Sequence, residues 1–282
     1  MIEKKIPRII WIYWDKGFDN APFVVRKCAD SWQKHNPGWD VRLLDDGNIK
    51  RYFDISAIVG ENRPDISIQK ISNIIRINLL SRFGGVWVDA ACYCRKPLDE
   101  WLDAYWGTGF FAFKKTEKDR ILSNWFLAAT QGNHLLTHFT AAHNAFWADH
   151  VFTNQHAWYG NKVRKKLRKW LNTPCRARLW LHPLFTDFLK IYPYYIFHYH
   201  FEKVISSDEQ SRSIWASSPA LSSDGPRAVR ILGFSSPVTQ DLLDRLKEID
   251  APVYKLDWRL DVPTESGGTL AEFILSGGES RQ

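Results

Sequence analysis

The stretch "FGGVWVDAACYC", Phe83 to Cys94, decides the fold class. Two glycines precede a run of apolar and β-branched residues, a pattern typical of a turn followed by a buried strand. We expect a strand over residues 86–94 that delivers Asp89 to the carboxyl edge of a sheet. A carboxylate there suits a divalent metal that bridges a diphosphate, whereas a cap on the next turn is the purely structural alternative. Ala91 stands where a second carboxylate would complete a metal pair.

The residues before this stretch predict a strand, a helix and a second strand. These elements are expected at Arg8–Trp14, Ala21–His35 and Trp39–Asp45. Such an order opens an α/β unit with a parallel sheet, and ligands of these sheets bind beyond the carboxyl ends of the strands. Trp14 and Asp15 are therefore expected at the mouth of a site.

A helix over residues 66–82 is expected directly before the two glycines. Ser72, Asn73 and Arg76 share one of its faces, because they are three or four positions apart. Glycine after the helix is a residue type suited to a left-handed cap. The helix therefore aims a polar face toward the same region as Asp89.

The rest of the chain predicts further elements and a single domain. The expected segments are a strand at Thr108–Phe113, a helix or strand-to-helix turn at Ile121–Thr130, a basic helical insertion around 137–200, a strand at Ala251–Leu260 and a tail at 261–282. We predict one α/β domain over residues 1–260, with a mostly parallel sheet and a helical elaboration.

Charge and composition limit the partner and the compartment. The net charge of +7 favours a polyanionic partner, which could be nucleic acid, anionic lipid or a phosphorylated small molecule. Fourteen Trp and seventeen Phe suit stacking on sugars and bases as well as core packing. Four cysteines without paired spacing, and a start without a leader pattern, predict a reducing cytoplasm. No apolar run is long enough to predict a membrane-spanning helix.

The segment Ile71–Trp101 resembles a glycosyltransferase signature. That signature places Ser-Asp-x-x-Arg on a helix, then a Gly-Gly turn, a strand ending in an Asp-x-Asp-like element, and Lys-Pro-Leu. It is similar to the capsular polysaccharide synthesis protein family, whose members are DXD-type sugar transferases of the GT-A fold. Further similar blocks follow the family's order over most of residues 5–260: "IPRIIWIYWDKGFDNAPFVVRKCADSW", "FFAFKK…ILSNWFLAAT", "YYIFHYHF" and "VYKLDWR". The resemblance implies a GT-A-like, Rossmann-type domain that binds a nucleotide-sugar.

The resemblance also implies roles for individual residues. Trp14 would stack on the base with the backbone of Tyr13 nearby, and Arg76 would reach the donor sugar or its phosphate. Asn124 would line the sugar pocket together with Asn73. These roles make Asn73, Arg76 and Asn124 the candidate catalytic residues.

Three further residues are implied at the diphosphate. Asp89 would hold Mn²⁺ or Mg²⁺, or the ribose and a metal-bound water, with Asp257 as a second candidate metal ligand. Lys255 would lie with Asp257 on a segment that closes over the diphosphate. Asp89→Ala is expected to abolish transfer with little change in thermal stability.

Two departures from the family pattern bear on the chemistry. Asn73 stands where the family has Asp, so it keeps hydrogen bonding to sugar hydroxyls but cannot act as a base. Ala91 removes one carboxylate of the Asp-x-Asp element. Metal binding through Asp89, the diphosphate and waters is favoured. Neutralisation of the diphosphate by Lys255 and arginines, without metal, is the competing prediction.

The expected function is transfer of a hexose from a UDP-linked donor to a surface glycan, with retention of configuration. The acceptor class would be capsule, O-antigen or lipopolysaccharide, as an oligosaccharide or lipid-linked glycan. A non-catalytic relative that binds sugar or nucleotide is the main alternative. A nucleic-acid-binding protein is disfavoured, because the aromatic residues lie in apolar runs and do not alternate with Lys and Arg. His182, His198 and His200 favour packing over a metal cluster.

The segment Asn161–Leu171 predicts a basic amphipathic helix. Six Lys or Arg lie between Lys162 and Lys169, and Trp170 shares an apolar side with neighbouring aliphatic residues. Such a helix suits the surface of an anionic bilayer. We therefore expect peripheral binding at the inner face of the cytoplasmic membrane; a solvated helix packed on the core is the alternative.

Overall fold

A five-stranded mixed sheet forms the centre of the protein, in the order β2-β1-β3-β6-β5. The computed structural model describes residues 5–60, 66–117, 120–150, 160–171, 173, 176–190, 194–260, 262 and 268–277. The strands are β1 (Ile9–Tyr13), β2 (Asp40–Leu44), β3 (Gly85–Asp89), β5 (Phe110–Glu117) and β6 (Arg120–Ala129). β1 is parallel to β2 and to β3, whereas β6 is antiparallel to both β3 and β5. The expectation of a mostly parallel sheet is therefore corrected, because the tight β5–β6 hairpin imposes antiparallel pairing.

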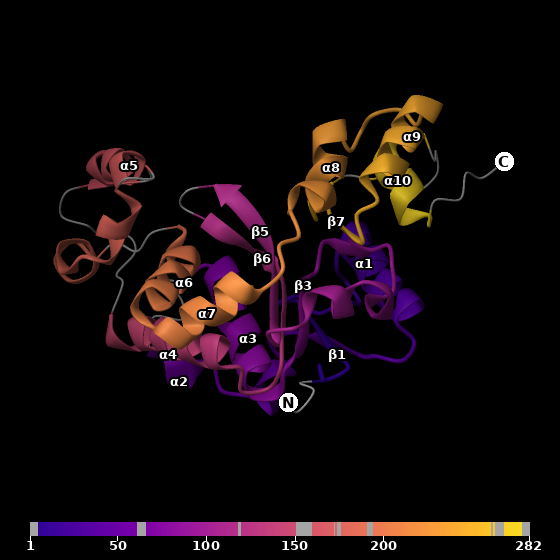
Figure 1. Ribbon diagram of the computed structural model, residues 1–282. Helices are drawn as coiled ribbons and strands as arrows, with labels where there is room; N and C mark the ends of the chain where they lie inside the picture. Colours follow the sequence, from indigo (N-terminus) through magenta and orange to yellow (C-terminus); the bar gives the residue numbers. More distant parts are fainter. Residues whose placement is uncertain are drawn as a thin grey trace.

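Helices cover both sides of this sheet (Figure 1). The helices are α1 (Phe23–His35), α2 (Ser56–Val59), α3 (Ile68–Phe83), α4 (His134–Asp149), α5 (Gly160–Leu171), α6 (Ile196–Ser207), α7 (Glu209–Ser217), α8 (Asp224–Leu232), α9 (Gln240–Ile249) and α10 (Leu270–Leu275). Figure 1 shows α3, α4, α6 and α7 gathered on one side, while α8, α9 and α10 lie beyond α1 on the other. Among the described residues, no helix is both long and apolar enough to cross a membrane.

Alternate residues of the central strands face two different cores. Trp11 and Trp87 pack with α3, α4 and α6, while Ile10 and Val88 pack with α1 and the segment after Cys94. Both sheet faces are buried, which explains why the strands read as continuous apolar runs. The α/β fold class predicted from the sequence is confirmed.

The Gly84–Gly85 pair allows the chain to turn from α3 into β3. Gly84 has φ 69° and caps α3, its N–H donating to the carbonyl of Leu80. Gly85 has φ 96°, and a Cβ there would come within 2.5 Å of the carbonyl oxygen of Ile9 on β1. Positive φ and this close approach both require glycine. The glycine expected at the helix end has a positive φ, although its ψ of −163° lies outside the left-handed helical region, and this turn sets the position where β3 enters the sheet.

The single strand expected over residues 86–94 is two strands in different sheets. β3 ends at Asp89, and β4 (Cys92–Cys94) pairs antiparallel with β7 (Val253–Lys255) in a separate two-stranded sheet. Ala90 and Ala91 form the turn between them. The expected strand over Ala251–Leu260 is correspondingly reduced to β7. This switch of sheets brings the C-terminal part of the chain beside Asp89.

Three other expectations change in the structure. In the segment 121–130, expected as a helix or strand-to-helix turn, residues 121–129 belong to β6, because this run is buried between β3 and β5. In the helical region expected around 137–200, α4 and α6 belong to the main core. The expected tail at 261–282 contains a helix, α10. A capping box of Thr269 and Glu272 forms the start of this helix, and its apolar side packs near α1.

Candidate active site

A cavity of about 820 Å³ lies at the carboxyl ends of β1 and β3. Tyr13 and Asp89, which end these strands, are direct neighbours in the parallel register. The polar face of α3 forms the floor, and the walls come from β6, the start of α6, α8 and the segment after β7. Trp14 and Asp15 both line this cavity, which lies where the sequence predicts a site. The size suits a small organic ligand.

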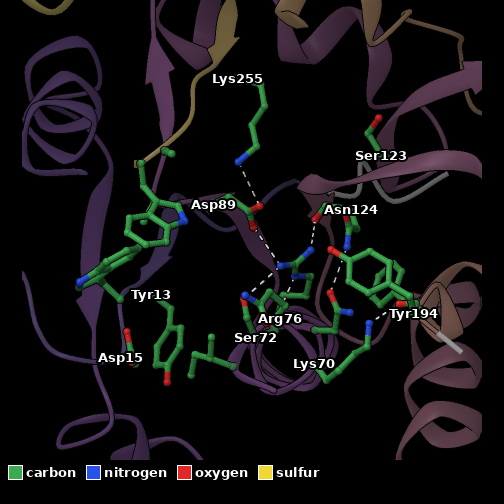
Figure 2. Close-up of a pocket in the computed structure, with 18 of the residues that line it drawn as sticks. Tyr13, Asp15, Lys70, Ser72, Arg76, Asp89, Ser123, Asn124, Tyr194 and Lys255 are labelled. Carbon is green, nitrogen blue, oxygen red and sulfur yellow. Dashed lines mark hydrogen bonds and ion pairs between the residues drawn. The ribbon is translucent and has the colours of Figure 1, made fainter. Parts of the chain in front are cut away.

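Arg76, Asp89 and Lys255 form an ion-paired group in this cavity (Figure 2). Asp89 Oδ1 accepts hydrogen bonds from Arg76 Nη2 at 2.9 Å and from Trp87 Nε1 at 3.1 Å. Asp89 Oδ2 accepts from Lys255 Nζ at 3.3 Å. Arg76 also donates to the hydroxyl of Ser72 at 3.1 Å. One carboxylate therefore pairs with two cations, one from α3 and one from β7, and the group keeps one net positive charge.

Arg76 is almost fully enclosed, and its partners fix the plane of its guanidinium. It donates to the backbone carbonyl of Asn124 and lies over the rings of Trp87 and Phe197, at 5.1 and 5.8 Å from their centroids. Burial alone would raise the pKa of Asp89, but Arg76 and Lys255 outweigh burial and lower that pKa below the ordinary value. Asp89 is consequently a stable anion and a weak base.

Asn73 and Asn124 meet beside the ion-paired group. Asn124 Nδ2 donates to Asn73 Oδ1 at 3.1 Å, and both side chains line the cavity. The neighbouring Ser123 also lines the cavity, and its buried hydroxyl has no hydrogen-bond partner within the described part of the chain. An unpartnered hydroxyl in the cavity lining offers hydrogen bonds to a polyhydroxylated ligand.

Two indoles stand at the rim of the cavity. Trp14 and Trp258 make an edge-to-face contact with ring centroids 5.6 Å apart, and both rings are partly exposed. Tyr13 turns its hydroxyl away from Asp89 and donates to Asp46 at 2.6 Å. The rim thus presents the flat aromatic surface expected of a base-stacking site, with Tyr13 as backbone support.

The cavity lining is strongly cationic. Seven basic side chains line it, namely Lys16, Lys70, Arg76, Arg120, Arg227, Arg230 and Lys255, whereas Asp15 and Asp89 are its only carboxylates among the described residues. Arg227 and Arg230 lie on α8, three positions apart, and sequence reasoning missed both. Nothing in their local sequence distinguishes α8 from an ordinary surface helix; only its packing against β7 turns them inward.

Aromatic residues at the start of α6 form the opposite wall. Tyr194, Tyr195, Phe197 and His198 line the cavity there. Lys70 donates to the backbone carbonyl of Tyr194 and lies over its ring, 4.2 Å from the centroid. Tyr194 is largely exposed toward the cavity mouth. This wall offers aromatic faces of the kind that pack against sugar rings.

Asp257 does not belong to the group formed by the other predicted residues. Its two oxygens accept hydrogen bonds from Arg259 at 2.9 and 2.7 Å, and it is absent from the cavity lining. The donor set predicted for a metal, Asp89 with Asp257, is therefore not assembled. Lys255, and not Asp257, contacts Asp89: its ammonium donates to Oδ2 of the carboxylate.

The histidines divide into a cavity residue and an enclosed pair. His198 lines the cavity, whereas His200 faces away and shares a hydrogen bond with His143 at 3.0 Å between their Nδ1 atoms. Trp147 donates to His143 Nε2 at 3.1 Å, so His143 must be neutral with its proton on Nδ1. Burial lowers the pKa of His200 to about 3 and that of His143 well below its usual range. The packing role favoured for His200 agrees with this geometry.

The described cysteines are buried small side chains. Cys28, Cys92 and Cys94 are free thiols, and burial raises the pKa of Cys92 and of Cys94 to about 12. They are inert at neutral pH. Cys175 lies outside the described residues.

A second set of potential metal ligands lies away from the cavity. His134, His138 and Asp208 place ligand atoms within 4.8 Å of one another, a set of three found within the described ranges. Asp208 caps α7 through the N–H of Ser211 and accepts a 2.9 Å contact from His134. These structural contacts account for the group without an ion.

With this geometry in place, comparison with known proteins identifies the family. A model of the capsular polysaccharide synthesis protein family matches residues 2–158, more than half of the chain. The chain belongs to the capsular polysaccharide synthesis protein family. The match contains Trp14, Arg76, Asp89 and Asn124, and it ends before Lys255, so the resemblance proposed for the later blocks stays a prediction.

Curated relatives of this family member carry glycosyltransferase names. The O-glycosyltransferase braB of Annulohypoxylon truncatum is 26% identical over 157 residues, which cover 49% of this chain and 37% of the relative. The glycosyltransferase afumC of Aspergillus fumigatus is 26% identical over 159 residues, covering 50% of this chain and 40% of the relative. The chain thus spans well under half the length of these relatives.

Solved structures give a weaker comparison. A chain described as PaToxG glycosyltransferase aligns with 76% of this family member and 88% of its own length, at 14% identity and a TM-score of 0.40.

Proposed function

We propose that this protein is a glycosyltransferase that moves a hexose from a nucleotide-sugar to a glycan acceptor, and that the nucleotide of the donor is UDP. The observation that carries the proposal is one cavity that combines two rim indoles, seven basic side chains and a paired Asp89 at the strand ends. Each part matches one part of a nucleotide-sugar. The proposal extends the family membership and the glycosyltransferase names of the relatives to a specific site.

The donor is assigned to the half of the cavity between β1, β3 and α8. The base would stack on the ring of Trp14. Trp258, which makes an edge-to-face contact with Trp14, would lie beside the base. Arg227, Arg230 and Lys255 would neutralise the diphosphate. The sugar would then reach the Asn73–Asn124 amide pair and the hydroxyl of Ser123.

The acceptor is assigned to the wall at the start of α6. Tyr194 and Tyr195 offer ring faces, and His198 adds a polar group. Asp89 is a weak base because its anion is held by two cations. We therefore favour retention, in which the acceptor hydroxyl gives its proton to the departing diphosphate oxygen as its own oxygen bonds to the anomeric carbon. The acceptor class is a surface glycan of capsule, O-antigen or lipopolysaccharide.

A panel of nucleotide-sugars tests this function. Full-length protein is incubated with UDP-, GDP- and dTDP-hexoses, and donor hydrolysis and transfer to oligosaccharide acceptors are followed by release of the nucleotide. We expect one UDP-hexose to be consumed, and Asp89→Asn to remove the activity. Tight donor binding without turnover would instead establish a non-catalytic sugar- or nucleotide-binding relative, and absence of any binding would refute the site.

We further propose that the segment 160–190 docks on an anionic membrane surface. Of the nine exposed large apolar side chains in the described residues, five lie here: Val163, Trp170, Leu179, Leu184 and Phe188. Leu167 and Leu171 on α5 pack inward with Trp180, so the helix is anchored on a small core and leaves its other residues outside.

Basic residues surround these exposed apolar side chains. Lys162, Lys165, Lys166 and Lys169 on α5 are exposed, and Arg176 lies over the ring of Trp170, 4.8 Å from its centroid. Each such cation near an anionic bilayer contributes about 1 kcal/mol, reduced by salt. The placement would hold the enzyme at the cytoplasmic face of the membrane, where a lipid-linked acceptor is presented.

Vesicle co-sedimentation tests the docking surface. Binding to vesicles with anionic lipid is expected and should fall as salt rises, while neutral vesicles bind little. Changing Lys165, Lys166 and Lys169 to Gln should remove binding and leave donor hydrolysis unchanged. The matched control changes Lys50, Arg51 and Lys247, exposed elsewhere, to Gln. Equal loss in both variants would mean that net charge, and not this surface, drives binding.

A further inference from the structure

The departing diphosphate needs positive charge, and a divalent metal on Asp89 was the expected source. Asp89 does not fit that role, because both of its oxygens are engaged. Arg76 and Trp87 donate to Oδ1, and Lys255 donates to Oδ2. A metal would have to displace a guanidinium or an ammonium from a carboxylate that their charges already neutralise.

No second carboxylate completes a metal site beside Asp89 in the described part of the chain. Asp257 is held in two hydrogen bonds by Arg259 and does not line the cavity. Asp15 does line it, but Figure 2 shows Asp15 near Tyr13, well apart from Asp89. Position 91, where a second ligand would follow Asp89 in sequence, carries only a methyl group. Mg²⁺ and Mn²⁺ prefer several oxygen ligands, and this lining supplies too few.

The ammonium of Lys255 lies instead where a cation would contact Asp89. Lys255 ends β7 and is opposite Cys92 in the β4–β7 register. The backbone N–H of Leu256 donates to the carbonyl of Ala91 at 2.8 Å, which ties the Lys255 segment directly to the turn after Asp89. The backbone at position 91 thus positions the lysine.

Two arginines add to the charge of Lys255. Arg227 and Arg230 line the cavity from α8, and α8 packs closely against β7. The three cations therefore belong to one structural unit on one side of the cavity. Their combined charge matches that of a nucleoside diphosphate, which carries two to three negative charges at neutral pH.

We infer that the protein binds and releases the diphosphate without a divalent metal, with Lys255 in the place of the metal and Arg227 and Arg230 completing the charge. This inference rests on the proposed function. The bond from the anomeric carbon to the β-phosphate oxygen breaks, and its electron pair stays on that oxygen. Lys255 stays protonated and stabilises the new charge through its ammonium.

Calorimetric titration of full-length protein with UDP tests the inference, in EDTA and again with excess Mn²⁺ or Mg²⁺. The dissociation constants are expected to agree within about twofold, and donor hydrolysis should continue in EDTA. Lys255→Ala and the double variant Arg227→Ala/Arg230→Ala should each weaken UDP binding by roughly tenfold or more in EDTA. Lys247→Ala, exposed on α9, is the control and should bind as the wild type does.

The possible outcomes separate the inference from the function beneath it. Binding that strengthens tenfold or more with Mn²⁺, or hydrolysis that EDTA stops and Mn²⁺ restores, would overturn metal independence while leaving the glycosyltransferase intact. Unchanged UDP affinity in Lys255→Ala and in the double arginine variant would also overturn it. Failure to bind UDP or any donor, with or without metal, would refute the proposed function itself.

Discussion

Two buried polar clusters in this protein have opposite character. The cluster of Arg76, Asp89 and Lys255 is charged and opens on the cavity. The cluster of His143, His200 and Trp147 is enclosed between α4 and α6 and is neutral. The first keeps its charges because each has a partner; the second is neutral because no anion in the described part of the chain contacts its imidazoles.

The difference shows which buried polar groups to associate with function. Both clusters contain perturbed groups, so a shifted pKa alone would not separate them. The direction of the shift and the access to a cavity do separate them. A carboxylate held as an anion at a cavity wall can orient cations toward a ligand, whereas neutral enclosed imidazoles fix the packing of two helices.

The largest expected effect comes from Asp89. Asp89→Asn keeps one acceptor oxygen, places an NH2 donor where the second oxygen was, and loses the charge that orients Arg76 and Lys255, so we expect transfer to fall by about 1,000-fold. Asp89→Ala should in addition destabilise the fold by about 3 kcal/mol, because it removes the carboxylate from the buried Arg76 and the partly buried Lys255. This revises the expectation of unchanged stability. Initial rates and urea unfolding measure the two effects, and more than a tenth of wild-type activity in Asp89→Asn would contradict the assignment.

Arg76→Lys should lower transfer by roughly 100-fold. The planar guanidinium contacts Ser72, Asn124 and Asp89 together, and a single ammonium cannot reproduce that fork. Arg82→Lys, exposed at the end of the same helix, is the matched control. Comparable rates in the two variants would show that the cavity needs only a charge at position 76.

The histidine cluster should respond to pH through stability and not through catalysis. Both folded-state pKa values lie below the unfolded value near 6.5, so the unfolded chain binds more protons as the pH falls. The free energy of unfolding is therefore highest above pH 6.5 and falls as the pH drops below that value. At pH 5 each histidine should have lowered it by about 2 kcal/mol. Urea unfolding at pH 7.5 and 5.0 measures this loss. The variant His143→Asn/His200→Asn should show a smaller pH dependence; an identical one would exclude the pair as its source.

The smallest expected effect is on nucleotide affinity at the rim. Removing the indole in Trp14→Ala should weaken UDP binding by roughly tenfold, since stacking on a base contributes about 1–3 kcal/mol. Trp14→Phe keeps an aromatic face and should retain most of the affinity. Calorimetry with UDP measures both, and unchanged affinity in Trp14→Ala would remove the stacking role and leave the charged cluster as the main donor contact.

Local sequence was enough to predict the first half of the site. The β1–α1–β2 order, the α3 face with Arg76 and the Gly-Gly turn all depend on short-range patterns, and Asp89 follows from them. β6 was assigned wrongly as a helix start because a strand buried on both faces shows no alternation. Arg227, Arg230 and Ser123 could not be found, since only long-range packing turns them toward the cavity.

The pairing of Asp89 with Lys255 also has a consequence for the order of synthesis. The two residues are 166 positions apart in the chain. At ordinary translation rates, Asp89 is made about 10–30 s before Lys255. A nascent chain can therefore close its central sheet around Arg76 and Asp89 while the cation that completes the cavity does not yet exist. The cavity acquires its full set of cations only once β7 has been made, so a chain that stops before Lys255 can close its central sheet and still lack the cation beside Asp89.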